Sequence, residues 1–156
     1  MQRQVVDANL STLAFEFFFW FSRFEFALKE NGYLQSHTPG TAAKPGWDSF
    51  IDKWKGKYVL STEANNLLAS PPEKQIVGQG SSLTWKPVEL ADCKSDLASV
   101  VRLVKTIRNN LFHGGKHGGA GWDDPARTQD LLNSGCAVLN HFADMSGLND
   151  DYRQEY

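Results

Sequence analysis

The residues best suited to chemistry in this 156-residue chain lie together at positions 108–113, in the order Arg-Asn-Asn-Leu-Phe-His, and two glycines follow at once. Arginine presents a fixed fork of donors that suits a phosphate. Histidine titrates near neutral pH and can accept or donate a proton. Arg108, Asn109 and His113 are therefore the groups that metal-independent cleavage of a phosphodiester needs, with Asn109 orienting the imidazole or donating to phosphate.

This chemistry would select RNA. A general base removes the proton from the 2′-hydroxyl, and the charge that then grows on the phosphate must be stabilised. His113 suits the first role as base or acid, Arg108 suits the second, and DNA lacks the 2′-hydroxyl. One objection is geometric, because residues five apart lie about 140° apart around a helix with 3.6 residues per turn. A fraying helix end and the long arginine stem reduce that separation.

Arg108 also has a structural interpretation. It lies on the apolar stripe of its helix, where a guanidinium must pair, reach solvent, or line a pocket or interface. For Arg108 considered alone, the spacing favours a salt bridge to Glu25 or Glu16 in the N-terminal helix. His113 considered alone is a plain capping residue, since cations suit helix C-termini. The catalytic interpretation needs both residues together.

Composition is that of an ordinary soluble globular domain with one core: 41% of the residues are apolar and 22% are charged. The net charge of −2 excludes a global basic field, so any RNA contact must use a local patch. Cys93 and Cys136 match no metal or redox spacing, and we expect small buried thiols in a reducing compartment.

The first apolar run, residues 13–21, is interrupted by Glu16 and followed by Arg23 and Glu25. It is too short and too charged to cross a bilayer, which needs about 20 apolar residues. We therefore expect no signal peptide, no membrane span and a cytoplasmic protein.

The first long helix is expected over residues 5–31, because no proline or glycine interrupts them and Gly32 can end the helix. Eight of the twelve residues from 15 to 26 are Phe or Trp. A helix that apolar on several faces needs cover on more than one side. Its own domain or a second subunit can provide that cover.

The remaining pattern predicts an all-α protein, an up-and-down bundle of four to five helices. The expected elements are a loop over 36–46, a short helix over 48–55, a helix from the cap Ser61 to residue 69, a helix over 93–113 capped by Asp92, and a helix over 125–145 between the cap Asp124 and the stop Gly147. Residues 73–90 are the least regular, with a short extended piece around 83–85. A single domain then covers residues 1–148, with an irregular insertion at about 36–90 and a loose polar tail over 149–156.

Candidate RNA-binding residues lie on one face of the 93–113 helix or just after it. They are Arg102, Lys105, Lys116 and His117. The first two form a partly cationic ridge with Asn109 and His113, at steps of three or four residues. The other two belong to a glycine-rich loop whose amides can contact a phosphate backbone, or which serves only as a flexible connector.

Other sites are not supported by the spacing. The glycines around His117 preclude a regular helix that would bring His113 and His117 together on a metal, and no cysteine is near. The glycine-rich loop follows a helix instead of a strand, which argues against a phosphate-binding P-loop. Trp85, Trp122 and Tyr33 can stack on bases, although isolated aromatic residues more often serve packing.

The sequence from 107 to 116 resembles the Arg-x4-His signature of the HEPN superfamily of α-helical domains, including the polar residue directly after the arginine. Glu25 and Lys29, four apart in the first helix, resemble the acidic and basic pair that several members carry near their Arg and His. The likeness covers the first helix, the motif helix and the helix after it. The segment from 38 to 90 adds nothing to it.

The resemblance implies a helical bundle that dimerises, with the two motifs forming a composite, metal-independent endoribonuclease site that uses no cofactor. Arg108, Asn109 and His113 are then catalytic, and Glu25 and Lys29 support them. Members are often toxins or phage-defence effectors. Some lack nuclease activity, so a non-catalytic module that binds a nucleotide, an RNA or a protein is the alternative. A helical antitoxin or immunity partner is a third interpretation.

Overall fold

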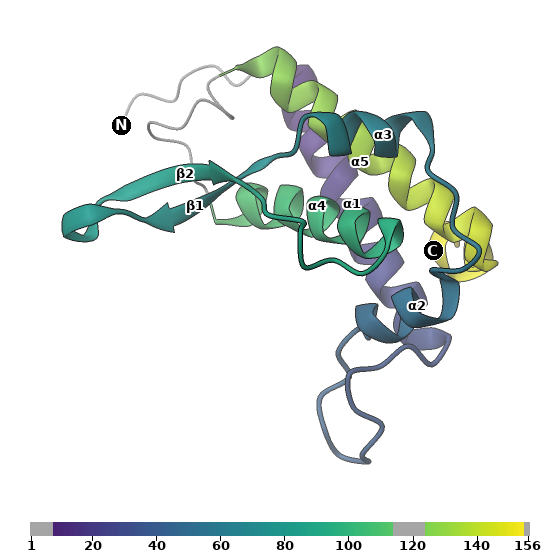
Figure 1. The fold of residues 1–156 in the computed structure, drawn as a ribbon. Coiled ribbons are helices and arrows are strands. Elements are labelled where there is room, and N and C mark those ends of the chain that lie inside the picture. The colour runs from purple at the N-terminus through teal and green to yellow at the C-terminus, as the bar shows by residue number, and fades with distance from the viewer. Residues whose placement is uncertain (1–7, 114–123, 155–156) are drawn as a thin grey trace.

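The computed structural model describes residues 8–113 and 124–154. This part of the chain is mostly helical, as predicted, with one two-stranded sheet (Figure 1). Its elements are α1 (Ala8–Glu30), α2 (Trp47–Trp54), α3 (Thr62–Ala69), β1 (Glu73–Val77), a 3-10 turn (Gln79–Ser81), β2 (Leu83–Pro87), α4 (Asp96–Phe112), α5 (Pro125–Ser146) and α6 (Asn149–Arg153).

The predicted stop of α1 and both predicted ends of α5 are confirmed. Gly32 has a φ of +80° just after α1, and the Tyr33 amide donates to the Leu28 carbonyl at 2.9 Å. Asp124 begins α5, with its carboxylate accepting from two backbone amides at 3.0 and 3.2 Å. Gly147 ends α5 with a φ of +71°.

The short helices agree closely with the sequence. The Ser61 hydroxyl accepts from the Ala64 amide at 3.1 Å and caps α3 as expected. Helix α2 begins at Trp47, one residue before the predicted start. An isolated bridge between Leu34 and Pro45 closes the loop that connects α1 to α2.

The N-cap of α4 is Ser95, so the assignment of Asp92 to that role was wrong. The Ser95 hydroxyl accepts from the Ala98 amide at 3.1 Å. Asp92 instead accepts two hydrogen bonds from the Arg102 guanidinium, at 2.5 and 3.0 Å. These hydrogen bonds hold the pKa of the Asp92 carboxyl below its usual value. The bidentate pair occupies the aspartate, and serine three residues later is as good a cap.

The extended piece expected around 83–85 is confirmed as part of β2, but the expectation that the rest of 73–90 is irregular was wrong, because most of it forms an antiparallel hairpin. Strands β1 and β2 pair from Glu73 opposite Pro87 to Val77 opposite Leu83, and the hairpin extends away from the helices (Figure 1). Both strands are exposed over most of their length, so their sequences lack the alternation of a half-buried strand.

The polar tail is ordered as α6 and not loose through residue 154. Tyr152 is buried against Phe24 and Trp20, and its hydroxyl donates to Asn140 Oδ1 at 3.0 Å. Arg23 of α1, also buried, donates to the backbone carbonyls of Asp151 and Tyr152. One aromatic residue and one buried arginine therefore dock a segment whose composition is otherwise polar.

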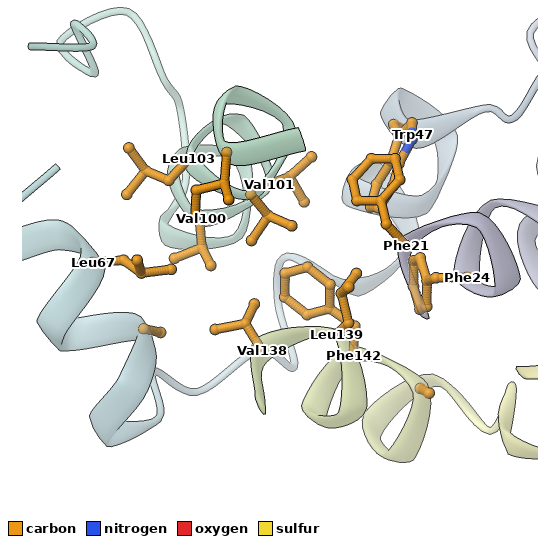
Figure 2. Packing of buried hydrophobic residues seen from close by; sticks show 14 of the residues in the cluster. Phe21, Phe24, Trp47, Leu67, Val100, Val101, Leu103, Val138, Leu139 and Phe142 are labelled. Carbon is orange, nitrogen blue, oxygen red and sulfur yellow. The ribbon is translucent and has the colours of Figure 1, made fainter. Parts of the chain in front are cut away.

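The core lies between α1, α4 and α5, with α2 and α3 packed against it. Figure 2 shows side chains from all five helices meeting there, among them Phe21, Phe24, Trp47, Leu67, Val100, Val101, Leu103, Val138, Leu139 and Phe142. Where α1 crosses α5, the buried ring of Phe17 lies against Gly135. A Cβ at Gly135 would lie 2.5 Å from Cε2 of that ring, so glycine permits the close approach of the two helices.

We predict that Gly135→Ala lowers the free energy of unfolding by about 1–2 kcal/mol. Overpacking costs about 1–3 kcal/mol, and an approach of 2.5 Å to a buried ring corresponds to the upper part of that range, about 2–3 kcal/mol. The gain of about 1 kcal/mol from alanine in a helix offsets part of this cost. Chemical denaturation measures the change. Gly56→Ala is the control, because nothing lies within 4 Å of a Cβ added there. A Gly135→Ala protein as stable as the wild type would contradict the packing at this crossing.

Candidate functional site

Helix α4 carries the three predicted catalytic residues on its last turn and at its C-cap. The helix is fixed by a buried apolar stripe that ends at Ile107. Its final turn, which follows the stripe, is only partly buried, and His113 at the C-cap is exposed. The His113 amide donates to the Asn109 carbonyl at 2.9 Å. The predicted helix end is therefore close to the observed one, while the two glycines after it lie outside the described residues.

Arg108 faces the aromatic helix α1. Its guanidinium carbon lies 5.7 Å from the centre of the buried Phe21 ring and 5.3 Å from that of Phe112. One guanidinium nitrogen donates to Asn109 Oδ1 at 3.0 Å. The expected salt bridge to Glu25 or Glu16 is not formed. In residues 8–113 and 124–154, no carboxylate pairs with this guanidinium, so cation–π contacts hold it in place.

His113 faces a different side, where it lines a pocket of about 330 Å³ between α4 and the hairpin. This His113 pocket is formed by Lys74, Gln75, Trp85, Thr106, Asn109, Asn110 and His113. Asn110 connects the two walls, because its side-chain amide donates to the Glu73 carbonyl at 2.7 Å. The hairpin is thereby tied to the end of the motif helix.

Among the described residues no hydrogen bond joins Arg108 to His113, although both side chains lie against the Phe112 ring, at 5.3 and 5.5 Å from its centre. The first lies over two rings near α1, and the second opens toward the hairpin, as the 140° separation predicts. Asn109 lies between them, because its Oδ1 accepts from Arg108 and the residue also lines the His113 pocket. A site that uses both groups on one phosphate therefore needs a change at the helix end or a second copy of the chain.

The predicted ridge lies along a larger groove of about 620 Å³ between α2 and α4. Arg102, Lys105 and Asn109 line it, and Arg102 is paired with Asp92 as described above. Asp48 and Asp52 of α2 also line this α2–α4 groove, so its charge is mixed. The other two predicted RNA-binding residues, Lys116 and His117, lie outside the described residues.

The predicted supporting pair lies at the end of α1. Glu25 Oε1 accepts from the Trp47 indole at 2.9 Å, and the Trp47 ring lies 5.7 Å from that of Phe21. Glu25 is thus linked to Arg108 through two aromatic rings and does not contact it. Lys29 lies eight residues beyond Phe21, which is about 12 Å further along the helix axis. The positive charge of Lys29 in the last turn of α1 interacts favourably with the helix dipole.

An exposed group of phenylalanines adjoins Arg108. We call Phe15, Phe18, Phe19 and Phe112 the aromatic patch; their exposures are 69%, 41%, 40% and 63%. Phe18 stacks on Phe112 with ring centres 6.2 Å apart, which joins α1 to the end of α4. Phe15 stacks on Phe19 with ring centres 6.4 Å apart, so the aromatic patch consists of two stacked pairs. Several exposed rings carried by one helix and its neighbour indicate an interaction site.

Cys136 lacks the lowered thiol pKa that is typical of a reactive cysteine. Burial, together with the nearby Glu16 charge, raises the pKa of its thiol to about 11. Both thiols are only partly buried and unbonded to each other.

Across residues 8–113 and 124–154, no group of three His, Cys, Asp or Glu side chains is positioned to hold a metal ion. None of the helices in those segments combines the length and hydropathy that crossing a bilayer requires.

Sequence reasoning missed Lys74 and Gln75 as neighbours of His113, and it considered Trp85 only as an isolated aromatic residue. The signal that could have found them is the Gln75–Trp85 cross-strand pair, which becomes visible only once the hairpin is recognised.

Comparisons with protein-family models, curated proteins and solved structures found no match to this chain.

We predict that Asn110→Ala loosens the hairpin from α4. Removing one hydrogen bond of about 1 kcal/mol should speed amide hydrogen exchange over residues 73–87 about fivefold. Mass spectrometry of peptides from that segment measures the effect. Asn133→Ala, an exposed position on α5, is the matched control and should leave the hairpin unchanged. Equal exchange in Asn110→Ala and wild type would show that this bond does not hold the hairpin.

Proposed function

We propose that this protein is a metal-independent endoribonuclease of the toxin or phage-defence type, with a composite active site formed by two copies of the chain in the cytoplasm. The proposal rests on the resemblance of the motif to the HEPN superfamily and on the surroundings of its residues. The proposal includes the fold: we take the mostly helical domain to be a HEPN-like bundle.

The observation that carries the proposal is the environment of Arg108. The structural interpretation required a carboxylate partner, and none of the described residues supplies one. The guanidinium is instead supported by Phe21 and Phe112 and by one bond to Asn109. Rings hold a guanidinium in place without neutralising its charge, so Arg108 remains able to bind an anion such as a phosphate.

The reaction follows from these groups. Nε2 or Nδ1 of a neutral His113 takes the proton of the ribose 2′-hydroxyl, and the 2′-oxygen attacks the adjacent phosphorus. Arg108 stabilises the charge on the non-bridging oxygens. The bond from phosphorus to the 5′-oxygen breaks, and that oxygen takes a proton from water, while the protonated His113 returns its proton to the solvent. The products are a 2′,3′-cyclic phosphate and a free 5′-hydroxyl.

A second copy of the chain resolves the separation of Arg108 from His113. In a two-fold dimer, Arg108 of one subunit can meet His113 of the other across the axis. The aromatic patch supports this arrangement because Phe112 stands between the two residues in the sequence and belongs to the patch. Burial of four partly exposed rings would contribute to the stability of such an interface.

The alternative is a non-catalytic module that binds RNA, a nucleotide or a protein, including an antitoxin or other partner. The His113 pocket favours it, since that pocket is complete without Arg108. The two proposals differ in whether the chain alters RNA.

We predict that the wild type cleaves mixed cellular RNA in EDTA and leaves 2′,3′-cyclic phosphate or 3′-phosphate ends. His113→Ala should reduce the rate about 10²–10⁴-fold through loss of the acid–base group. Arg108→Ala should reduce it about 10²–10³-fold through loss of charge stabilisation. Gel analysis with end-group mapping measures both effects.

The matched controls are His37→Ala and Arg153→Ala, which remove the same residue types from exposed positions elsewhere. They should cleave like the wild type. Equal cleavage by all variants would identify another site or a contaminant. An inactive wild type would favour the binding module.

Mixed dimers test the sharing of residues between subunits. We predict that equal amounts of Arg108→Ala and His113→Ala chains, unfolded and refolded together, regain about a quarter of the wild-type rate, because half of the dimers are mixed and each has one intact pair. Each variant refolded alone should stay inactive. The absence of any regained activity would contradict sharing of one Arg108–His113 pair between subunits. It would indicate that the two residues act from the same chain, or that the site needs Arg108 and His113 of both subunits.

A further inference from the structure

The residues that line the His113 pocket come from three elements. Strand β1 supplies Lys74 and Gln75, β2 supplies Trp85, and the last turns of α4 supply its remaining wall. Gln75 and Trp85 are directly opposite each other in the hairpin, so their side chains lie on the same face of the sheet. The hairpin thus presents an aromatic ring and an amide on the same face. Lys74, which pairs with Lys86 on the opposite face, lies at the edge of the pocket. After the hydrogen bonds from Lys86 and Arg102, its charge also lowers the pKa of the Glu89 and Asp92 carboxyls.

These groups match the parts of one nucleotide. The volume of about 330 Å³ is at the lower end for ligand sites, which suits a ligand of that size. An indole face stacks on any base, side-chain amides bind base edges, and an ammonium group binds phosphate. None of the lining residues is a carboxylate, so nothing within the pocket wall repels an anion.

The α2–α4 groove is a poorer match for RNA although it is larger. Three carboxylates line it, those of Asp48, Asp52 and Asp92, and Asp92 is the partner of Arg102. Phosphates in that groove would face negative charge and compete for an arginine that is already paired. The RNA path is therefore better placed over the hairpin than along the ridge that the sequence suggested.

We propose that the His113 pocket is a nucleotide subsite, in which a base of single-stranded RNA stacks on Trp85 and its phosphate binds Lys74. This inference rests on the proposed ribonuclease function and specifies its substrate. The nucleotide held there is the one whose 2′-hydroxyl lies next to His113. A base within a duplex is stacked on its neighbours and cannot enter the pocket, so the substrate is a single strand or an unpaired loop.

The test measures binding of a fluorescently labelled 2′-O-methyl RNA hexamer, which cannot be cleaved because the 2′-oxygen is blocked. Fluorescence anisotropy gives the Kd for the full-length protein. We expect Trp85→Ala to raise the Kd about tenfold or more and Trp85→Phe to keep most of the affinity, because phenylalanine retains a stacking face. Lys74→Gln should reduce the slope of log K against log salt by about 0.7, the value for one phosphate contact on a single strand.

Two controls separate local from general effects. Leu83→Ala changes an exposed residue of the same strand, and Lys53→Gln removes the same charge from an exposed position of α2 outside both cavities. Both should bind like the wild type. Amide exchange over the hairpin of Trp85→Ala checks that the hairpin remains folded, and the salt dependence of Lys74→Gln carries the test if it does not.

The outcomes distinguish the subsite from the ribonuclease. No binding by the wild type, or equal binding by wild type, Trp85→Ala and Lys74→Gln, would overturn the subsite, even if unmodified RNA is still cleaved in EDTA. Binding that depends on Trp85 and Lys74 would support the subsite. The same binding without cleavage of unmodified RNA would keep the subsite and reject the ribonuclease.

Discussion

Helix α1 carries aromatic side chains on more faces than the described part of the chain covers, and the rest of the structure depends on that constraint. Phe17 and Phe24 drive folding, because their rings are buried against α5, α6 and the tryptophan of α2. Phe18 on another face remains partly exposed and stacks on Phe112. Phe21, which is buried, gives Arg108 one of its two rings. The helix that forms the core therefore also positions the candidate phosphate-binding group.

Cation–π support explains how an arginine can lie beside apolar surface without a counter-ion. A salt bridge at Arg108 would have neutralised the guanidinium and satisfied its donors. Ring faces attract the cation with about 0.5–2 kcal/mol and leave its edge donors for another acceptor. Within residues 8–113 and 124–154, one of those donors is used, in the bond to Asn109. The charge is thus restrained in position and still able to act on a substrate, which is the combination that electrostatic catalysis requires.

The sequence was most informative where a local rule decides the structure. Ser61, Asp124, Gly32 and Gly147 were predicted because caps and stops act within a few residues. The hairpin was missed because its strands are exposed on both faces, and α6 was missed because Tyr152 docks through contacts more than 100 residues away on α1. The motif itself was found because its members are contiguous. Its surroundings depend on long-range contacts that no local pattern encodes.

The two sides of α4 also make the proposed binding of RNA compatible with a net charge of −2. Recognition needs no general basic field if a stacking surface, a few amides and one ammonium group are brought together next to His113. Assembly, in turn, needs apolar surface, and that lies around Phe18 and Phe112 beside Arg108. The proposed nucleotide subsite and the proposed dimer contact thus use different sides of the helix, the hairpin side and the α1 side. Two residues connect these sides: Asn109 accepts a hydrogen bond from Arg108 and lines the pocket, and the Phe112 ring lies against both Arg108 and His113.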